Sequence, residues 1–142
     1  MTRMDAAALW RFLEQTFPQA IEAGFTIETA DDQAVRLRLV TGDAHLRPGG
    51  TVSGPTLMML ADTAMYLALL ARVGPEALAV TTNLEMHFLR RPRPGVLVAE
   101  GQVVKLGRRL AVGQVWIRAE GDADPVALAT VTYARTEDRP VS

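Results

Sequence analysis

The spacing of hydrophobic residues changes along this chain, and each spacing predicts a different element. Between Leu9 and Phe17 apolar side chains recur at helical spacing, behind Asp5 as a candidate N-cap and ahead of Pro18 as a stop. Residues 35–39 instead alternate apolar and arginine side chains, which is typical of a half-buried antiparallel strand. The N-terminal part therefore predicts one amphipathic helix followed by strand structure.

The longest apolar segment, residues 55–71, predicts a second helix of a different kind. Ser53 and Gly54 suit its start, a proline occupies its first turn, and Gly74 suits its end. Because the segment is apolar nearly all round, it must be covered on most sides. It is shorter than the roughly 18 to 20 residues that a membrane span requires, and it carries Asp62 near its centre. We therefore expect a buried core helix and no membrane partner.

The second half of the chain predicts a run of strands. Segments rich in valine, leucine, threonine and aromatic residues alternate there with turns that contain glycine, proline or aspartate. With the two earlier segments, the predicted strands are residues 25–29, 35–39, 79–89, 95–105, 110–119 and 126–134. Residues 41–52 contain too many turn-forming residues for regular structure. The order predicts an α+β fold, in which one curved antiparallel sheet wraps the apolar helix within a single domain spanning residues 1–142.

Composition excludes several classes of function. The net charge of −1 gives no electrostatic reason to expect a nucleic acid as partner. The chain has no cysteine, which excludes disulfides, thiolate nucleophiles and cysteine-based zinc sites. His45 and His87 have no second ligand at a recognisable metal-binding spacing, so we expect no metal site. The N-terminal residues lack the pattern of a secretion signal, and we expect a cytoplasmic protein.

Asp62 is the residue of the apolar helix that most indicates chemistry. A carboxylate enclosed by apolar side chains is costly unless it is paired, neutralised or functional. The start of the same helix offers unpaired backbone N–H groups and the positive end of the helix dipole. Such donors can stabilise the oxyanion that forms when a carbonyl carbon is attacked, and Gly54 lets a substrate approach the backbone closely. Taken alone, Asp62 could still be a solvent-facing or salt-bridged residue.

The segment from Arg47 to Tyr66 reads Arg-Pro-Gly-Gly-Thr-Val-Ser-Gly-Pro-Thr-Leu-Met-Met-Leu-Ala-Asp-Thr-Ala-Met-Tyr. It resembles the signature of PaaI-like hotdog-fold acyl-CoA thioesterases, in which a His-Gly-Gly turn opens the central helix and Leu-Ala-Asp-x-Ala follows at fixed spacing. The resemblance continues through residues 79–89, the turn at 105–110 and the closing strand at 127–133, and covers about residues 20–135. It implies a hotdog fold, here with an extra N-terminal helix.

Site residues follow from the resemblance position by position. Asp62 matches the catalytic acid of the family, which acts as nucleophile or as general base on water. Gly54 matches the glycine whose N–H polarises the thioester carbonyl. Thr81 falls where related enzymes place a hydroxyl that positions the attacking water, with Thr82 or Asn83 as substitutes if the register differs.

The chain departs from the family pattern at two positions. Ser53 replaces the histidine of the His-Gly-Gly turn, and Arg47 stands where many relatives have an asparagine. Basic turns at Arg108 and Arg109, and at residues 90–93, could grip the phosphates of coenzyme A. The candidate substrate-binding residues are Arg47, Ser53, Asn83, Arg108 and Arg109.

The resemblance implies hydrolysis of acyl-CoA thioesters, with phenylacetyl, hydroxyphenylacetyl and medium-chain acyl groups all open. It implies no cofactor, because coenzyme A is part of the substrate. It also implies a homodimer or homotetramer, with the strand at residues 81–89 as the dimer edge. The alternatives are a non-catalytic acyl-CoA-binding protein and a hotdog dehydratase or hydratase, although a hydratase needs a histidine where this chain has Ser53.

Overall fold

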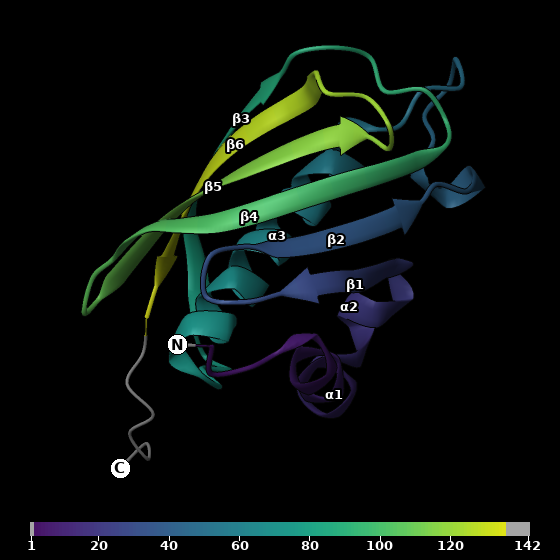
Figure 1. Ribbon diagram of the computed structural model, residues 1–142. Helices are drawn as coiled ribbons and strands as arrows, with labels where there is room; N and C mark the ends of the chain where they lie inside the picture. Colours follow the sequence, from purple (N-terminus) through teal and green to yellow (C-terminus); the bar gives the residue numbers. More distant parts are fainter. Residues whose placement is uncertain (1, 136–142) are drawn as a thin grey trace.

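The fold is a six-stranded sheet curved around a long helix (Figure 1). The computed structural model describes residues 2–135. In that part of the chain the helices are α1 (Ala6–Thr16), α2 (Pro18–Glu22) and α3 (Gly54–Val73), with a short 3₁₀ turn η1 (Asp43–His45). The strands are β1 (Phe25–Ala30), β2 (Val35–Val40), β3 (Val80–Phe88), β4 (Val96–Leu106), β5 (Leu110–Ala119) and β6 (Pro125–Ala134). They lie in the order β1-β2-β4-β5-β6-β3, every neighbouring pair antiparallel, which confirms the predicted α+β fold.

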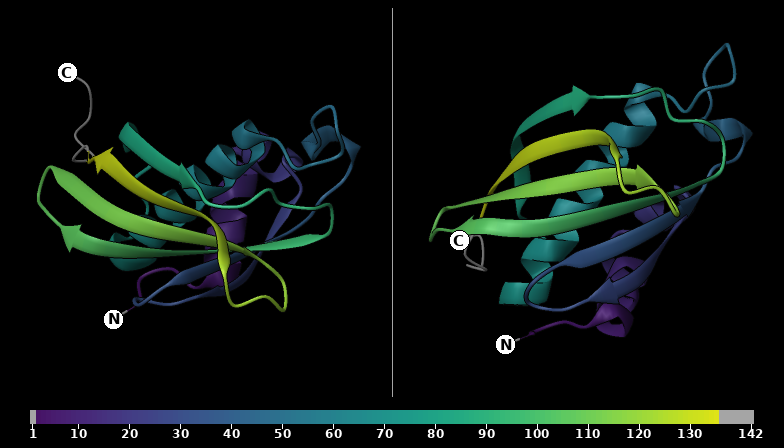
Figure 2. Two further views of the ribbon diagram at one scale, coloured as in Figure 1. Left: turned by 90° about the horizontal axis from the view of Figure 1, so that it is seen from above. Right: turned by 45° about the horizontal axis from the view of Figure 1, so that its top comes forward.

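Helix α3 lies in the concavity of the sheet, and most of its surface is covered (Figures 1 and 2). Leu60, Met65 and Leu69 are fully buried there against the inward residues of the sheet. By length and by its mean hydropathy of 1.4 this helix could also cross a membrane, but 67% of its most apolar window is buried inside the fold. The predicted core helix is therefore confirmed.

Two glycines let the sheet approach α3 closely. A Cβ atom at Gly101 on β4 would lie 2.9 Å from the carbonyl oxygen of Ala64 on α3, a separation that real Cβ atoms do not show. A Cβ atom at Gly113 on β5 would overlap the Met65 sulfur. The backbone of the sheet thus packs directly against the helix at these two points, which fixes the distance between the two layers.

The two edge strands of the sheet have different surroundings. Strand β1 is flanked by α1, whose Trp10 packs edge-on against Phe25 with ring centroids 6.1 Å apart. Strand β3 pairs with β6 on one side, and Val80 and Phe88 at its ends are 55% and 54% exposed. Figure 2 shows β3 at the rim of the sheet, alongside α3. An unpaired edge with exposed apolar side chains is a surface for pairing with another strand.

One local prediction from the sequence is wrong, and another is incomplete. Pro18 ends the first helix as expected, but it also occupies the first turn of α2, where its missing N–H and fixed φ are tolerated. The sequence predicts no regular structure at residues 41–52, yet this segment contains η1 and an isolated bridge between Leu46 and Val52. The six predicted strands all exist, with ends shifted by a residue or so.

Substituting Gly101→Ala should destabilise the fold by about 1–3 kcal/mol, because the added methyl group would press on the Ala64 backbone rather than on a flexible side chain. Urea unfolding followed by circular dichroism measures the change. Gly42→Ala is the matched control, since Gly42 has φ −125° and no atom within 4 Å of a built Cβ. Equal midpoints for the two variants would contradict the close approach described above.

Candidate active site

Asp62 lies on the side of α3 that the sheet leaves open. Its side chain is half-buried, and it lines a groove of about 340 Å³ formed by residues of α3, β3, β6 and the loops before α2 and β3. Met58, one turn earlier on the same face, is 42% exposed. The expectation of a carboxylate enclosed by the core is therefore wrong, because Asp62 stands at the rim of the core and opens into the groove.

Two hydroxyl groups donate to the same oxygen of this carboxylate. Thr81 Oγ1 donates to Asp62 Oδ1 at 2.7 Å, and the Tyr133 hydroxyl donates to the same atom at 2.8 Å. Within residues 2–135, no group donates a hydrogen bond to Asp62 Oδ2. One oxygen of the carboxylate is thus held in place while the other is left for chemistry.

A bulge in β3 brings Thr81 to this position. The register with β6 shifts between Thr81 and Asn83, so Thr82 has no cross-strand partner. Thr81 faces α3, and Leu84 also packs against the core, although residues three apart in a regular strand lie on opposite faces. The extra residue of the bulge reverses the alternation and turns the Thr81 hydroxyl toward Asp62.

Tyr133 enters the site from β6 and is almost fully buried, at 4% exposure. Its ring stacks on that of Tyr66, with centroids 5.7 Å apart and planes 21° from parallel. Burial raises the pKa of the Tyr133 phenol well above its usual range, and the charge of Asp62 adds to this effect. The phenol therefore keeps its proton and acts as a hydrogen-bond donor throughout the physiological pH range.

The start of α3 forms a second polar cluster, centred on Ser53. The Ser53 hydroxyl accepts from the Thr56 N–H at 3.2 Å and lies 2.8 Å from Thr56 Oγ1, which donates to the carbonyl oxygen of His45 at 3.3 Å. Pro55 has no N–H, and the Leu57 N–H bonds to the Ser53 carbonyl. Among the described residues the Gly54 N–H has no acceptor. It is the first-turn donor that remains open to a ligand.

His45 holds the loop in front of this helix start. Its Nδ1 accepts from the Gly42 N–H at 2.8 Å, so the proton of the neutral ring is on Nε2, which donates to the Ala23 carbonyl at 2.9 Å. Its own carbonyl accepts from the Ser53 N–H at 2.8 Å. The imidazole is therefore used in joining α2, the loop and the N-terminus of α3, and not in the groove beside Asp62.

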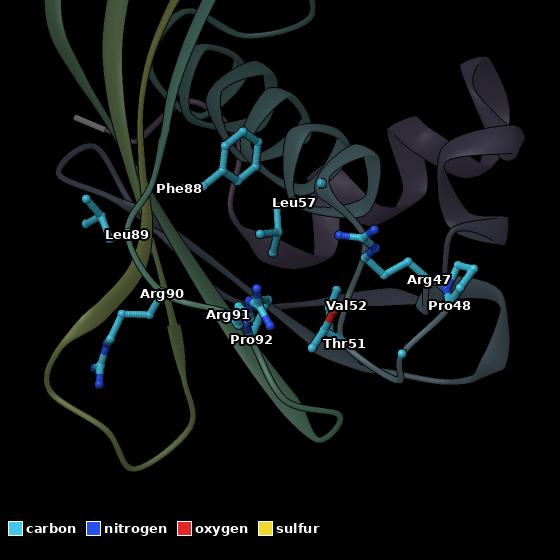
Figure 3. A pocket seen from close by; sticks show the side chains of 12 residues that line it. Arg47, Pro48, Thr51, Val52, Leu57, Phe88, Leu89, Arg90, Arg91 and Pro92 are labelled. Carbon is cyan, nitrogen blue, oxygen red and sulfur yellow. The ribbon is translucent and has the colours of Figure 1, made fainter.

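Gly54 lines a groove other than the one that contains Asp62. This groove, about 590 Å³ in volume, has an apolar floor that includes Leu57 and Phe88, with arginines at its mouth (Figure 3). Figure 3 shows the Arg47 side chain reaching from the loop toward Leu57, whereas Arg90 points away and pairs with Asp122 at 3.2 Å. An open N–H at a helix N-terminus beside an arginine suits a developing negative charge.

A single chain does not bring the Gly54 donor and the Asp62 carboxylate together. Eight residues of α-helix separate them, which is about 12 Å along the axis and about 80° around it. They line separate grooves with no lining residue in common. One thioester carbonyl cannot contact both groups within one copy of the chain.

Comparison with known proteins places this architecture in a family. The model of the thioesterase superfamily matches residues 49–126, which is more than half of the chain and includes Gly54, Asp62 and Thr81. The chain belongs to the thioesterase superfamily. The predicted recognition of a PaaI-like hotdog thioesterase is confirmed, and with it a thioester-hydrolysing enzyme.

Individual relatives agree with this assignment. A candidate thioesterase from a Silicibacter species has a similar structure, with a TM-score of 0.87, 43% identity, and coverage of 96% of this chain and 95% of that one. A mutant of the phenylacetic acid degradation protein PaaI from Thermus thermophilus gives a TM-score of 0.73 at 31% identity, covering 84% and 99% of the two chains. A candidate esterase of Halobacterium salinarum is 30% identical over 134 residues, 88% of this chain and 87% of that protein.

The predicted site residues of this thioesterase fall into three groups in space, with Asn83 apart from all three. Asp62 and Thr81 meet in one groove, and Gly54, Ser53 and Arg47 gather at the start of α3 beside the other. Arg108 and Arg109 lie on the turn between β4 and β5, away from the helix start. Asn83 pairs with Thr132, and Thr132 lies between two inward-facing residues of β6. The side chain of Asn83 is therefore on the outer face of the sheet and does not approach Asp62.

Sequence reasoning missed Tyr133 and the role of His45. Tyr133 belongs to the inward-facing set of the last strand, with Val131 and Ala129, and periodicity alone gives every member of that set the same core role. Its contact with Asp62 depends on the register of β6 against β3, which no local pattern specifies. His45 lies in a segment rich in turn residues, so its hydrogen bonds to Gly42 and Ala23 carry no sequence signal.

Replacing Ser53→Ala should destabilise the thioesterase by about 1 kcal/mol, because the side chain that accepts from the Thr56 N–H is lost. Ser53→Thr, which retains a capping hydroxyl, is the matched control and should stay within about 0.5 kcal/mol of the parent. Thermal and urea unfolding measure both variants. If Ser53→Ala were as stable as the parent protein, the capping role of Ser53 would be refuted.

Proposed function

We propose that this enzyme hydrolyses acyl-CoA thioesters, with Asp62 as nucleophile or general base and a Gly54 N–H as the oxyanion donor. The main support is the arrangement of the Asp62 carboxylate in a groove beside the central helix. Its Oδ1 accepts hydrogen bonds from Thr81 and Tyr133, whereas its Oδ2 accepts none from the described residues. Membership of the thioesterase superfamily supports the reaction class. The apolar lining of the grooves suits phenylacetyl-type or medium-chain acyl groups.

The reaction begins when a water molecule, or Asp62 Oδ2 itself, attacks the thioester carbonyl carbon. If water attacks, Asp62 takes its proton, and the carbonyl oxygen becomes an oxyanion that accepts from the Gly54 N–H. Collapse of this intermediate breaks the carbon–sulfur bond, and the leaving thiolate takes up the proton. If Asp62 attacks, the acyl group passes through an anhydride that water then hydrolyses. Both routes give the free acid and the CoA thiol.

The geometry of β3 supports a site shared between two copies. Asp62 bonds to Thr81 near one end of β3, and a Cβ built on Gly54 lies 3.6 Å from the ring of Phe88 at the other end. If two β3 edges pair antiparallel about their centres, the Phe88 end of one copy meets the Thr81 end of the other. That arrangement would set the Gly54 N–H of one copy beside the Asp62 carboxylate of its partner, and it would pair the open edge of β3.

Coenzyme A would then extend toward the turn that carries Arg108 and Arg109. This turn is at the same end of the sheet as Thr81, because Ala134 on β6 pairs with Leu110 on one side and with Val80 on the other. The side chain of Arg135 bonds to the Gly107 carbonyl at 2.8 Å and to Glu76 at 2.6 Å, which holds the turn near the loop before β3. A fixed basic turn at this end of the sheet suits the phosphates of the substrate.

The alternatives differ in measurable ways. A hydratase of this fold needs an imidazole beside the acid, but the His45 ring bonds to Gly42 and Ala23, and the His87 ring pairs with Glu85 on an exposed part of β3. A non-catalytic acyl-CoA binder would bind the substrate without releasing thiol. Hydration of crotonyl-CoA and binding without turnover are therefore the two results that would favour these alternatives.

The Asp62→Asn variant should lose about 10²- to 10⁴-fold in kcat, because the amide can neither attack the carbonyl nor take a proton from water. A free-thiol assay measures this across phenylacetyl-, hydroxyphenylacetyl- and medium-chain acyl-CoA, and the parent enzyme's preference in the same panel identifies the acyl class. Asp43→Asn, an exposed carboxylate outside both grooves, is the matched control and should keep the parent rate. Unchanged turnover by Asp62→Asn would contradict this mechanism.

Pairing through β3 can be tested with a single introduced cysteine, since the chain has none of its own. Glu85→Cys near the middle of β3 should be joined into dimers by a short bismaleimide, with activity retained. Glu28→Cys on β1 is the control, because that exposed residue lies on the opposite edge strand and should stay monomeric on denaturing gels. Cross-linking of the β1 variant alone would place the interface at the wrong edge for a shared site.

A further inference from the structure

We infer that Tyr133 is the positioning residue of the site: its hydroxyl fixes the Asp62 carboxylate so that Oδ2, and not Oδ1, is the oxygen that reacts. This inference rests on the proposed function, since it concerns how the same carboxylate is presented to the thioester or to water. The sequence motif of the helix start contains neither Tyr133 nor the strand on which it lies.

The first support is the use of the two carboxylate oxygens. A carboxylate oxygen has two lone pairs, and Oδ1 accepts one hydrogen bond from Thr81 and another from Tyr133. These two donors occupy Oδ1, so an incoming water proton or carbonyl carbon meets Oδ2. The Tyr133 hydroxyl also lies 3.3 Å from the Asp62 carbonyl oxygen, so it touches both the side chain and the backbone of that residue.

The second support is the rigidity of the tyrosine compared with the threonine. The Tyr133 ring is 4% exposed and stacked on Tyr66, which is one turn after Asp62 on the same helix. Thr81, in contrast, is exposed at the edge of the sheet, and its hydroxyl can rotate. A donor locked by packing holds a catalytic group to within a fraction of an ångström, whereas a mobile donor follows it. Tyr133 therefore sets the orientation and Thr81 reinforces it.

The third support is the constant protonation of the phenol. Because burial raises the pKa of Tyr133 well above its usual range, the hydroxyl keeps its proton and remains a donor to Asp62. A neutral donor beside a carboxylate stabilises its charged form at every pH at which the enzyme could work. Removal of the hydroxyl alone takes away this donor and leaves the stacked ring in place, which separates its effect from a loss of packing.

The Tyr133→Phe variant tests the inference, because it keeps the stacked ring and removes the hydroxyl. We expect kcat for the best substrate of the acyl-CoA panel to fall by about 10- to 100-fold with KM nearly unchanged, since the carboxylate would lose its fixed orientation. Urea unfolding of the same variant should give nearly the parent midpoint, because the stacked ring is retained. Thr130→Val on the outer face of β6 is the matched control and should change neither quantity.

A second variant keeps the test informative if Tyr133→Phe is poorly stable. Thr81→Val changes an exposed residue and leaves Tyr133 as the remaining donor, so it should lower kcat less than Tyr133→Phe does. In the double variant both donors are absent, and the loss in kcat should differ from the product of the two single losses, because both residues contact one carboxylate and are energetically coupled.

The outcomes separate this inference from the proposed function. If Asp62→Asn is inactive while Tyr133→Phe has the parent kcat and KM, the positioning role is wrong and the hydrolase mechanism stands. If Tyr133→Phe lowers the free energy of unfolding and loses activity only in proportion to the unfolded fraction, Tyr133 is a packing residue only, and the inference is again overturned. If the parent enzyme releases no thiol from any substrate of the panel, the proposed function itself fails.

Discussion

The requirement to cover an apolar helix on nearly all sides determines most of this structure. Helix α3 carries one carboxylate among buried leucine, alanine and methionine side chains, and a single layer of strands has to enclose it. Gly101 and Gly113 let that layer come close enough for backbone to meet helix. Since one curved sheet does not close around a helix, a strip of α3 remains beyond β3, and Asp62 lies on that strip. The position of the site is therefore a consequence of incomplete coverage.

The bulge in β3 connects this packing to the chemistry. On the inner face of β3, Leu84 packs against the core and Thr81 bonds to the Asp62 carboxylate. These two positions are an odd number of residues apart. Only a change of alternation satisfies both, and the unpaired Thr82 supplies it. The same shift places Thr81 directly opposite Tyr133, so that two strands deliver two donors to one oxygen. A one-residue slip would remove Thr81 from the site while leaving the strand count unchanged.

The sequence predicts the parts of this molecule that depend on local pattern. Periodicity and turn residues predict the helix between Gly54 and Val73 and the six strands. The position of one charged residue in an apolar segment singles out Asp62. What escapes prediction depends on long-range register. Tyr133 is indistinguishable from its inward-facing neighbours until β6 is aligned with β3, and the expected burial of Asp62 exceeds the observed burial because the sequence does not show where the sheet ends. Motif resemblance supplied Gly54 and Thr81, but it could not supply the distance between them.

The separation along α3 also explains why the departures at the helix start need not disable the enzyme. The donor at Gly54 comes from the backbone and depends on the helix starting where it does, which Ser53 secures by capping Thr56 and by its own bond to the His45 carbonyl. Serine supplies the side-chain oxygen that this cap requires, and the cap needs no imidazole. Arg47 then adds a positive charge to the mouth of the same groove, where a helix dipole already favours negative charge. Both replacements are therefore compatible with the proposed role of Gly54 as oxyanion donor, and under that proposal the attacking carboxylate is Asp62 of a second copy.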